Sequence, residues 1–184
     1  MVLRAALAAL AIFVASGCGY RLAHSPGPDV PVRVSTLTND TLEPGVELML
    51  ASALRREIDR TGGLRLVERA TTSGYQVGGR VLRVETVSRT FTPGVRALEY
   101  TVTVQLELRV TGPGGRRVAI DPFAQRASEI YLASTDVQIS RKNRDEALRR
   151  VAALLADRIR LEIERLDGGG GTHAGARRQG EREA

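Results

Sequence analysis

The sequence of 184 residues has few of the residues that build disulfides, metal sites and large aromatic cores. It holds one Cys, two His and no Trp, and aromatic residues make up 4%. A single Cys excludes an intrachain disulfide and any site with several Cys ligands. No apolar run reaches the roughly 18–20 residues that a membrane-spanning helix needs. The length predicts one domain, and 42% of hydrophobic residues is an ordinary globular content.

Charge and histidine placement argue against two broad classes of function. The net charge is +6, without the dense basic stripe that is usual in nucleic-acid-binding domains. His24 and His173 lie outside the periodic part of the sequence, so no packed core orients them for acid–base chemistry. The chain has no Gly-x-Ser-x-Gly motif, and Gly112–Gly115 lacks the Gly-Lys-Ser/Thr end of a phosphate loop. We therefore expect a protein that is not an enzyme, uses no cofactor or metal and binds no nucleic acid.

The amino terminus has the pattern of a secretory signal. Met1–Arg4 is short and positively charged, and residues 5–16 form an apolar run that is followed by small residues. The only Cys ends this segment in the sequence Ala-Ser-Gly-Cys, which resembles a bacterial lipoprotein signal. Acylation of that Cys anchors the protein and removes a thiol that would be reactive in an oxidising compartment. The pattern predicts a signal peptide over residues 1–17, lipidation of Cys18 and, because Gly19 is not Asp, sorting to the outer membrane.

Three regions follow the signal. Residues 18–30 contain two prolines and no periodicity, which predicts a lipidated, extended tether. Residues 31–166 carry the hydrophobic patterns of a folded domain. Residues 167–184 include four consecutive glycines and almost no apolar residue, so we expect a disordered, polar tail.

Hydrophobic periodicity in the domain predicts several strands and two helices. Alternating apolar residues indicate strands at 32–37, 64–67, 75–91 and 100–111, with further strand patterns at 117–120 and 126–132. Helical spacing predicts one helix from Pro44 to Gly62 and another from a cap at Asn143 to Leu166. A phase change predicts a β-bulge near Gly78–Leu82. The expected fold is α+β, with two helices packed on one face of a mainly antiparallel, roughly four-stranded sheet.

Several short motifs occur in an order that resembles one protein family. They are Cys18-Gly19-Tyr20-Arg21-Leu22, Asn39-Asp40-Thr41-Leu42-Glu43-Pro44-Gly45-Val46-Glu47, Tyr75-x-Val77-x-Gly79-x-Val81, Glu99-Tyr100 and Asn143-x-x-Glu146-Ala147-Leu148. Over residues 1–166 the chain resembles the LptE family, the lipopolysaccharide-assembly lipoproteins of the outer membrane.

The resemblance implies a non-enzymatic role. Members of the family sit as a plug inside the barrel of the LptD translocon, help it to assemble and bind lipopolysaccharide that arrives from the periplasm. For this chain the resemblance implies a lipid-anchored outer-membrane protein whose domain faces the periplasm and the barrel lumen. The signal, tether and domain also fit a lipoprotein subunit of another envelope assembly, for secretion, efflux or peptidoglycan-synthase regulation.

Basic residues at two predicted loop ends are the candidate binding site. Arg89 and Arg96 flank the turn at Thr92–Gly94, and Arg141 and Lys142 directly precede the predicted last helix. Arg forms bidentate hydrogen bonds with phosphate, which suits the phosphorylated lipid A of lipopolysaccharide. The resemblance also implies a role for these places, because basic residues at the hairpin tip and before the last helix are linked to lipopolysaccharide binding in the family. The alternative is that all four are ordinary solvated surface charges.

Overall fold

The computed structural model describes residues 29–60, 62–89 and 99–179, with the side chains of the last helix described up to Gly168. The expected signal peptide, Cys18, most of the tether, Arg96 and the turn at Thr92–Gly94 lie outside these residues. The elements follow in the order β1 (Val30–Asn39), α2 (Val46–Arg60), β2 (Leu64–Leu66), β3 (Tyr75–Ser88), β4 (Glu99–Thr111), η1 (Pro113–Gly115), β5 (Arg117–Val118), η2 (Pro122–Gln125), β6 (Arg126–Leu132) and α3 (Val137–Gln179).

One six-stranded sheet forms the centre of the domain, with the strand order β2-β1-β3-β4-β5. β3 and β4 form a long antiparallel hairpin. β6 pairs with the first half of β4 and β5 with its last two residues, both antiparallel, so these strands share one edge of β4. β1 runs parallel to both β2 and β3, so the sheet is mixed rather than purely antiparallel, although most of its pairing is antiparallel as expected, and it has more strands than expected. The physical reason is α2, because a helical crossover returns the chain to the end where β1 began and makes the following strand parallel.

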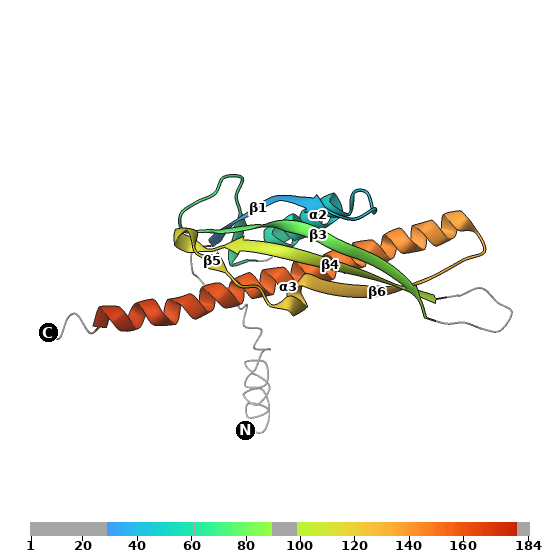
Figure 1. Ribbon diagram of the computed structural model, residues 1–184. Coiled ribbons are helices and arrows are strands. Elements are labelled where there is room, and N and C mark those ends of the chain that lie inside the picture. Colours follow the sequence, from blue (N-terminus) through green and yellow to red (C-terminus); the bar gives the residue numbers. More distant parts are fainter. Residues whose placement is uncertain (1–28, 61, 90–98, 180–184) are drawn as a thin grey trace, which may run out of the picture.

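Both helices lie against one face of the sheet, which confirms the predicted two-layer α+β arrangement (Figure 1). α2 buries one apolar stripe, and α3 buries a longer one against the sheet and against α2. The buried residues of α2 are Val46, Leu50, Ala51, Ala53, Leu54 and Ile58. No helix in the described part of the chain covers the opposite face, which we call the open face.

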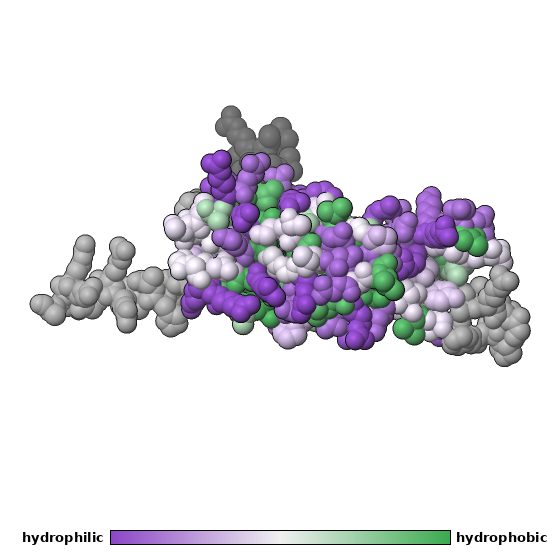
Figure 2. Space-filling view, turned by 45° about the horizontal axis from the view of Figure 1, so that its top comes forward, coloured by the Kyte–Doolittle hydropathy of each residue, from purple (hydrophilic) through white to green (hydrophobic). Residues whose placement is uncertain are grey.

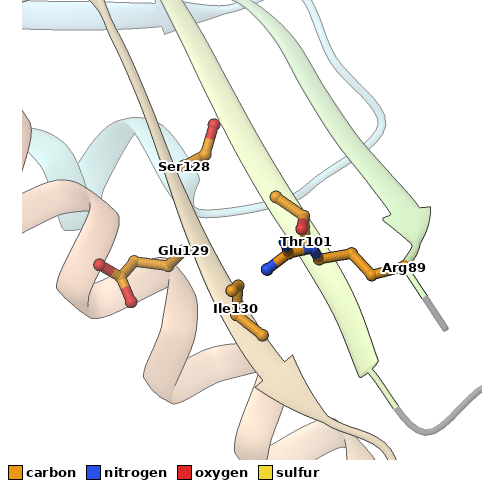
Figure 3. Close-up of a pocket in the computed structure, with 5 residues that line it drawn as sticks. All are labelled: Arg89, Thr101, Ser128, Glu129 and Ile130. Atoms are coloured by element: carbon orange, nitrogen blue, oxygen red, sulfur yellow. The ribbon is translucent and has the colours of Figure 1, made fainter.

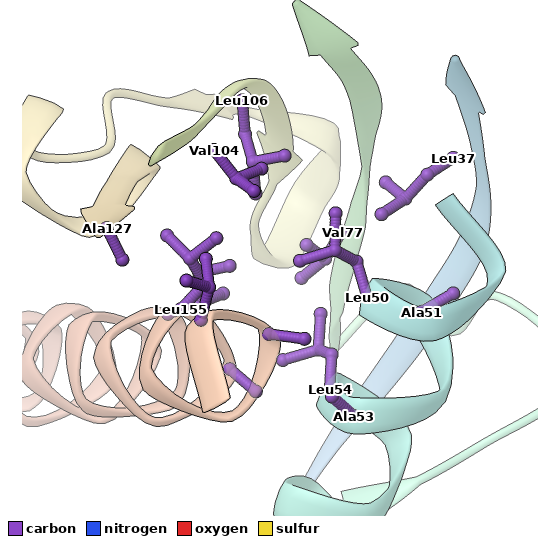
Figure 4. Packing of buried hydrophobic residues seen from close by; sticks show 14 of the residues in the cluster. Leu37, Leu50, Ala51, Ala53, Leu54, Val77, Val104, Leu106, Ala127 and Leu155 are labelled. Atoms are coloured by element: carbon purple, nitrogen blue, oxygen red, sulfur yellow. The ribbon is translucent and has the colours of Figure 1, made fainter. Parts of the chain in front are cut away.

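The hydrophobic core fills the space between the two layers (Figure 4). Side chains of β4 alternate as predicted: Val102, Val104 and Leu106 are buried, whereas the residues between them point to the open face. Leu155 of α3 meets this face of the sheet from the helix layer. Burial of each such side chain stabilises the fold by about 1.5–3 kcal/mol. On the side of the molecule seen in Figure 2, hydrophilic residues predominate and hydrophobic ones appear as separate small patches.

The long hairpin contains the predicted irregularity. The register of β3 against β4 shifts between Val81 and Arg83, which confirms a bulge near Gly78–Leu82. Gly79 in this stretch has a φ of 148°, and a Cβ there would lie 2.1 Å from the carbonyl oxygen of Glu107. Only glycine therefore fits where the two backbones approach. The bulge keeps apolar side chains on the helix-covered face on both sides of the phase change.

The last helix begins earlier than expected. It starts at Val137, and the Oδ1 of Asp136 accepts the N–H groups of Gln138 at 2.7 Å and Ile139 at 3.4 Å. The predicted cap at Asn143 was wrong, because Asp136 already satisfies the free N–H groups about two turns upstream. Hydrophobic periodicity did not predict these first turns, because their apolar residues, Val137 and Ile139, are exposed and form no buried stripe.

The last helix also extends further than expected. Its backbone continues as far as Gln179, whereas the expected helix ended at Leu166. None of the helices in the described ranges has the length and hydropathy that crossing a membrane requires.

Candidate functional site

Arg89 lies directly after β3, at the loop end of the long β3–β4 hairpin. Its backbone N–H donates to the carbonyl oxygen of Glu99 over 2.9 Å, which fixes its position relative to the start of β4. The side chain is exposed, and within the described part of the chain no carboxylate forms an ion pair with it. The guanidinium is therefore available to an external anion.

Arg141 and Lys142 lie in the second turn of α3 rather than before the helix. This corrects their expected position, and the cause is the early cap at Asp136. Both side chains are exposed, and neither takes part in an ion pair among the described residues. The helix therefore presents two neighbouring cations to solvent.

The residues that follow these two cations fix the start of α3 to the domain. Arg144 makes a bidentate ion pair with Glu43 in the β1–α2 loop, at 2.8 and 2.5 Å. These hydrogen bonds hold the pKa of the Glu43 carboxyl below its ordinary value, although partial burial opposes the shift. The side-chain amide of Asn143 donates to the carbonyl oxygen of Leu132 at 2.9 Å. The position of Arg141 and Lys142 is therefore set by contacts with β6 and with the β1–α2 loop.

Side chains of α3 also occupy the free edge of β6. Arg150 donates to the carbonyl oxygen of Ile130 at 3.1 Å, and Arg158 donates to that of Arg126 at 2.7 Å. Because these carbonyl oxygens already accept hydrogen bonds from α3, they are not available to pair with a further strand. These contacts hold β6 in register beside β4 and lock it to the helix layer.

Segments that are far apart in the sequence meet at one end of the molecule. β3 ends, β4 begins, β6 ends and α3 begins there, on the right of Figure 1. In the sheet, Tyr100 pairs with Ser88 on one side and with Tyr131 on the other. The rings of Tyr100 and Tyr131 stack with their centroids 5.5 Å apart, on the side of the helices. We call this region the hairpin end; the structure brings Arg89, Arg141 and Lys142 to it.

The open face is hollowed at the hairpin end (Figure 3). The hollow has a volume of about 360 Å³ and is lined by Arg89, Thr101, Ser128, Glu129 and Ile130. The side chain of Arg89 extends across Thr101 toward β6, whereas the carboxylate of Glu129 points away to the helix layer. There Glu129 pairs with Arg150 at 3.2 Å. Arg89 is thus the one cationic side chain among the five that line the hollow.

Three of these lining residues could not be found from the sequence. Thr101, Ser128 and Ile130 have no motif; the β3–β4 pairing places Thr101 beside Arg89, and the pairing of β6 with β4 adds Ser128 and Ile130. The alternation within 126–132 predicts which of its residues share a face of the sheet, but it does not predict which strand lies beside them.

The open face beyond the hairpin end has a different electrostatic arrangement. Arg80 of β3 pairs with Glu107 of β4 at 2.7 Å and with Asp40 at 2.9 Å. Hydrogen bonds from Arg80 hold the pKa of Glu107 below its ordinary value. Nearby, Arg83 pairs with Glu85 at 2.7 Å. Arg80 and Arg83 in the centre of this face are therefore neutralised by neighbouring carboxylates.

Comparison with protein families identifies the domain. A family model described as lipopolysaccharide-assembly matches residues 30–163, well over half of the chain. The chain belongs to the LptE family. The match contains the whole sheet and α3 as far as Ile163, and with them the hairpin end. LptE is a family of outer-membrane lipoproteins of lipopolysaccharide assembly, which agrees with the resemblance of the motifs. A comparison with curated proteins gave no match.

Solved structures of several bacterial proteins share the LptE-like fold. An uncharacterized lipoprotein B from Nitrosomonas europaea has a TM-score of 0.52 and 13% identity, over 79% of this chain and 89% of that chain. A hypothetical protein from Chlamydia trachomatis has a TM-score of 0.51 and 9% identity, over 74% and 98%. A putative lipoprotein from Caulobacter crescentus has a TM-score of 0.50 and 15% identity, over 72% and 86%. At these identities the likeness concerns the fold alone.

Among the described residues, no group of three or more His, Cys, Asp or Glu side chains is placed to hold a metal ion. Neither His belongs to the residues whose side chains are described. The unpaired cations of the hairpin end are accordingly the best candidate site, and their chemistry is anion binding rather than proton transfer.

Proposed function

We propose that this LptE-family lipoprotein binds lipopolysaccharide at the hairpin end through Arg89, Arg141 and Lys142, with Arg96 in the same hairpin as a further contact. The observation that carries the proposal is that the three described cations lie at one end of the domain without internal partners. A cation that is already paired has little to gain from a phosphate, whereas an unpaired one forms a charge-assisted hydrogen bond. The phosphates of lipid A are the anions that a lipopolysaccharide-assembly protein meets.

The second part of the proposal concerns the partner. The domain acts as the plug of an LptD-type outer-membrane β-barrel and assists its assembly, with the open face and the hairpin end inside the lumen. Family membership supports this role. The outer edge of β6 supports it too. Its carbonyl oxygens already accept hydrogen bonds from α3, so a domain that sits beside the strands of a barrel would not pair with them through β6.

Cys18 attaches the domain to the outer membrane. The sole Cys directly follows the apolar run of the signal, and several acyl chains give stable anchoring where one gives only reversible binding. Mass spectrometry of the mature protein should show Cys18 as the amino terminus with a lipid-sized mass increment. A peptide from the mature protein that spans Ser16 to Arg21 would disprove lipidation at this site.

The binding site is tested by reversing its charge. The variant R141D/K142D alters two exposed side chains without touching the core, so the fold should survive. Contacts with charged groups contribute about 1.5–3 kcal/mol each, so affinity for purified lipopolysaccharide should fall at least about tenfold. Binding by the parent protein should also weaken with salt.

The matched control is R116D/R117D, which reverses two adjacent exposed arginines at the opposite end of the sheet. It should bind lipopolysaccharide as the parent does. Equal losses in both variants would mean that net charge, and not the hairpin end, governs binding.

The partner is tested by isolating the lipidated protein from membranes in detergent. A stoichiometric LptD-type barrel should accompany it. If the protein instead brings a periplasmic or inner-membrane complex, and no barrel, a role in another envelope assembly is the correct interpretation.

A further inference from the structure

The hairpin end exposes apolar side chains beside its unpaired arginine. Val87, Ile130 and Leu132 have relative exposures of 61, 42 and 59%. Thr101 of β4 pairs directly with Val87 on one side and with Ile130 on the other, and Leu132 pairs with Glu99. Directly paired residues of antiparallel strands share a face of the sheet. Because Val102 points into the core, Val87, Ile130 and Leu132 all lie on the open face; we call them the apolar strip.

The apolar strip borders the hollow. Ile130 and Thr101 line it, and the side chain of Arg89 reaches across Thr101 from the β3 side (Figure 3). A volume of about 360 Å³ lies within the range of ligand sites, roughly 300–1,000 Å³. The hollow therefore combines one cation, Arg89, and one apolar side chain, Ile130, with polar lining residues, and the other two residues of the apolar strip lie outside its lining.

The rest of the open face shows that this composition is local. One step along β4, Thr103 pairs with Glu85 and Ser128, and its hydroxyl lies 2.8 Å from that of Ser128. One step further, Gln105 pairs with Arg83 and Arg126. Among the described strand residues of this face, exposed large apolar side chains therefore occur only at the end where Arg89 lies, beside Thr101 and Glu99.

We propose that the apolar strip and the hollow bind an acyl chain of lipopolysaccharide while Arg89 contacts a phosphate of the same lipid A. This inference rests on the proposed function and adds to it a hydrocarbon subsite on the sheet. Charge complementarity selects the occupant: a cation beside exposed apolar surface matches an amphipathic anion. If the strip instead bound a purely apolar protein surface, Arg89 would lose its water without gaining a hydrogen-bond partner, which is unfavourable.

The test compares two ligands and two variants. The ligands are intact lipopolysaccharide and the same material after alkaline deacylation, which keeps the phosphates. The variant V87T/I130T keeps β-branched residues in the strands but makes the strip polar. The control variant L154Q/L161Q removes two exposed apolar side chains from the outer surface of α3.

We expect the parent to bind intact lipopolysaccharide at least about tenfold more tightly than the deacylated form, since hydrocarbon burial adds to the phosphate contacts. V87T/I130T should lower affinity for the intact ligand to near that for the deacylated one and leave the deacylated affinity unchanged. L154Q/L161Q should bind both ligands as the parent does. The intact ligand should keep its advantage at high salt, because apolar contacts are not screened.

Two results would overturn the inference while leaving the proposed function in place. One is undiminished binding of intact lipopolysaccharide by V87T/I130T. The other is equal affinity of the parent for both ligands. If V87T/I130T instead loses the barrel partner and keeps the lipid, the strip is a protein-docking surface. If the parent binds neither ligand, the proposed function itself is wrong and the acyl subsite fails with it.

Discussion

The centre and the hairpin end of the open face are built on the same strands, yet they use their charges in opposite ways. In the centre, Arg80 lies between Glu107 and Asp40, whose carboxylates neutralise its charge. At the hairpin end, Arg89 has no carboxylate partner within the described residues and lies beside exposed Val87 and Ile130. An exposed arginine is therefore informative about ligand binding only when its neighbours are known. A count of basic residues along the sequence does not separate the two cases.

The largest effect is expected when the hairpin end is made to resemble the centre. Thr101→Glu places a carboxylate beneath Arg89, where Figure 3 shows the guanidinium crossing this residue. Because the new ion pair competes with phosphate, affinity for lipopolysaccharide should fall about tenfold, measured by titration. Thr111→Glu, on the same face at the far end of β4, is the control and should have little effect. Equal binding by Thr101→Glu and the parent would show that Arg89 does not contact the ligand.

The next effect concerns the stability of the hairpin end. Glu43→Gln removes the charge that pairs with Arg144, a pair intermediate between exposed and buried ones. The free energy of unfolding at pH 7 should fall by about 1–2 kcal/mol, measured in urea.

The same pair gives a pH dependence of known sign. The folded-state pKa of Glu43 lies below its ordinary value of 4.5, so the contribution of the pair is present above that pH and is lost as pH falls through the folded pKa. Parent and Glu43→Gln should therefore converge in stability once the pH falls below the folded-state pKa of Glu43. A constant difference down to that pH would contradict a role for the carboxylate charge.

A smaller effect is expected when the centre is made to resemble the hairpin end. Glu107→Gln removes one of the two carboxylates beside Arg80, and Asp40 remains. Affinity for lipopolysaccharide should rise by about twofold at most, because exposed ion pairs are weak and the centre has no apolar strip. A tenfold rise would show that unpaired charge alone makes a site on this face, and that the apolar strip is unnecessary.

The smallest effect is expected at the end of the molecule opposite the hairpin. Truncation after Asp167 removes four glycines, each about 1 kcal/mol less favourable than alanine in a helix, and the polar residues beyond them. The free energy of unfolding should change by less than about 0.5 kcal/mol, measured by denaturation of the soluble domain. A large loss of stability would show that the tail docks on the domain.

Much of the fold was predictable because its signals are local. The alternation in β4, the apolar stripe of α2 and the phase change near Leu82 each follow from side chains that must face one core. The parallel pairing of β1 was not predictable in this way. Alternation shows which face of a strand is buried but says nothing about its neighbour or direction.

The candidate site was also only partly predictable from the sequence. The basic residues were visible in the sequence as clusters at loop ends. Their environment was not, because Ile130 reaches Arg89 only through a third strand, β6, that pairs with β4. The start of α3 was missed for a related reason: its first turns bury nothing, so hydrophobic periodicity could not reveal them.

By itself, the sequence determined the elements with one buried face, the two-layer α+β class, the lipoprotein-type signal at Cys18 and the resemblance to the LptE family. Each depends on residues close together in the chain or on a fixed order of short motifs. Only the tertiary structure decided which arginines are paired and which apolar side chains gather at the hairpin end. Arg80 is neutralised by Glu107 across the hairpin, because strand register, set by packing over the whole sheet, places the two residues opposite each other, whereas the side chain of Arg89 lies across Thr101.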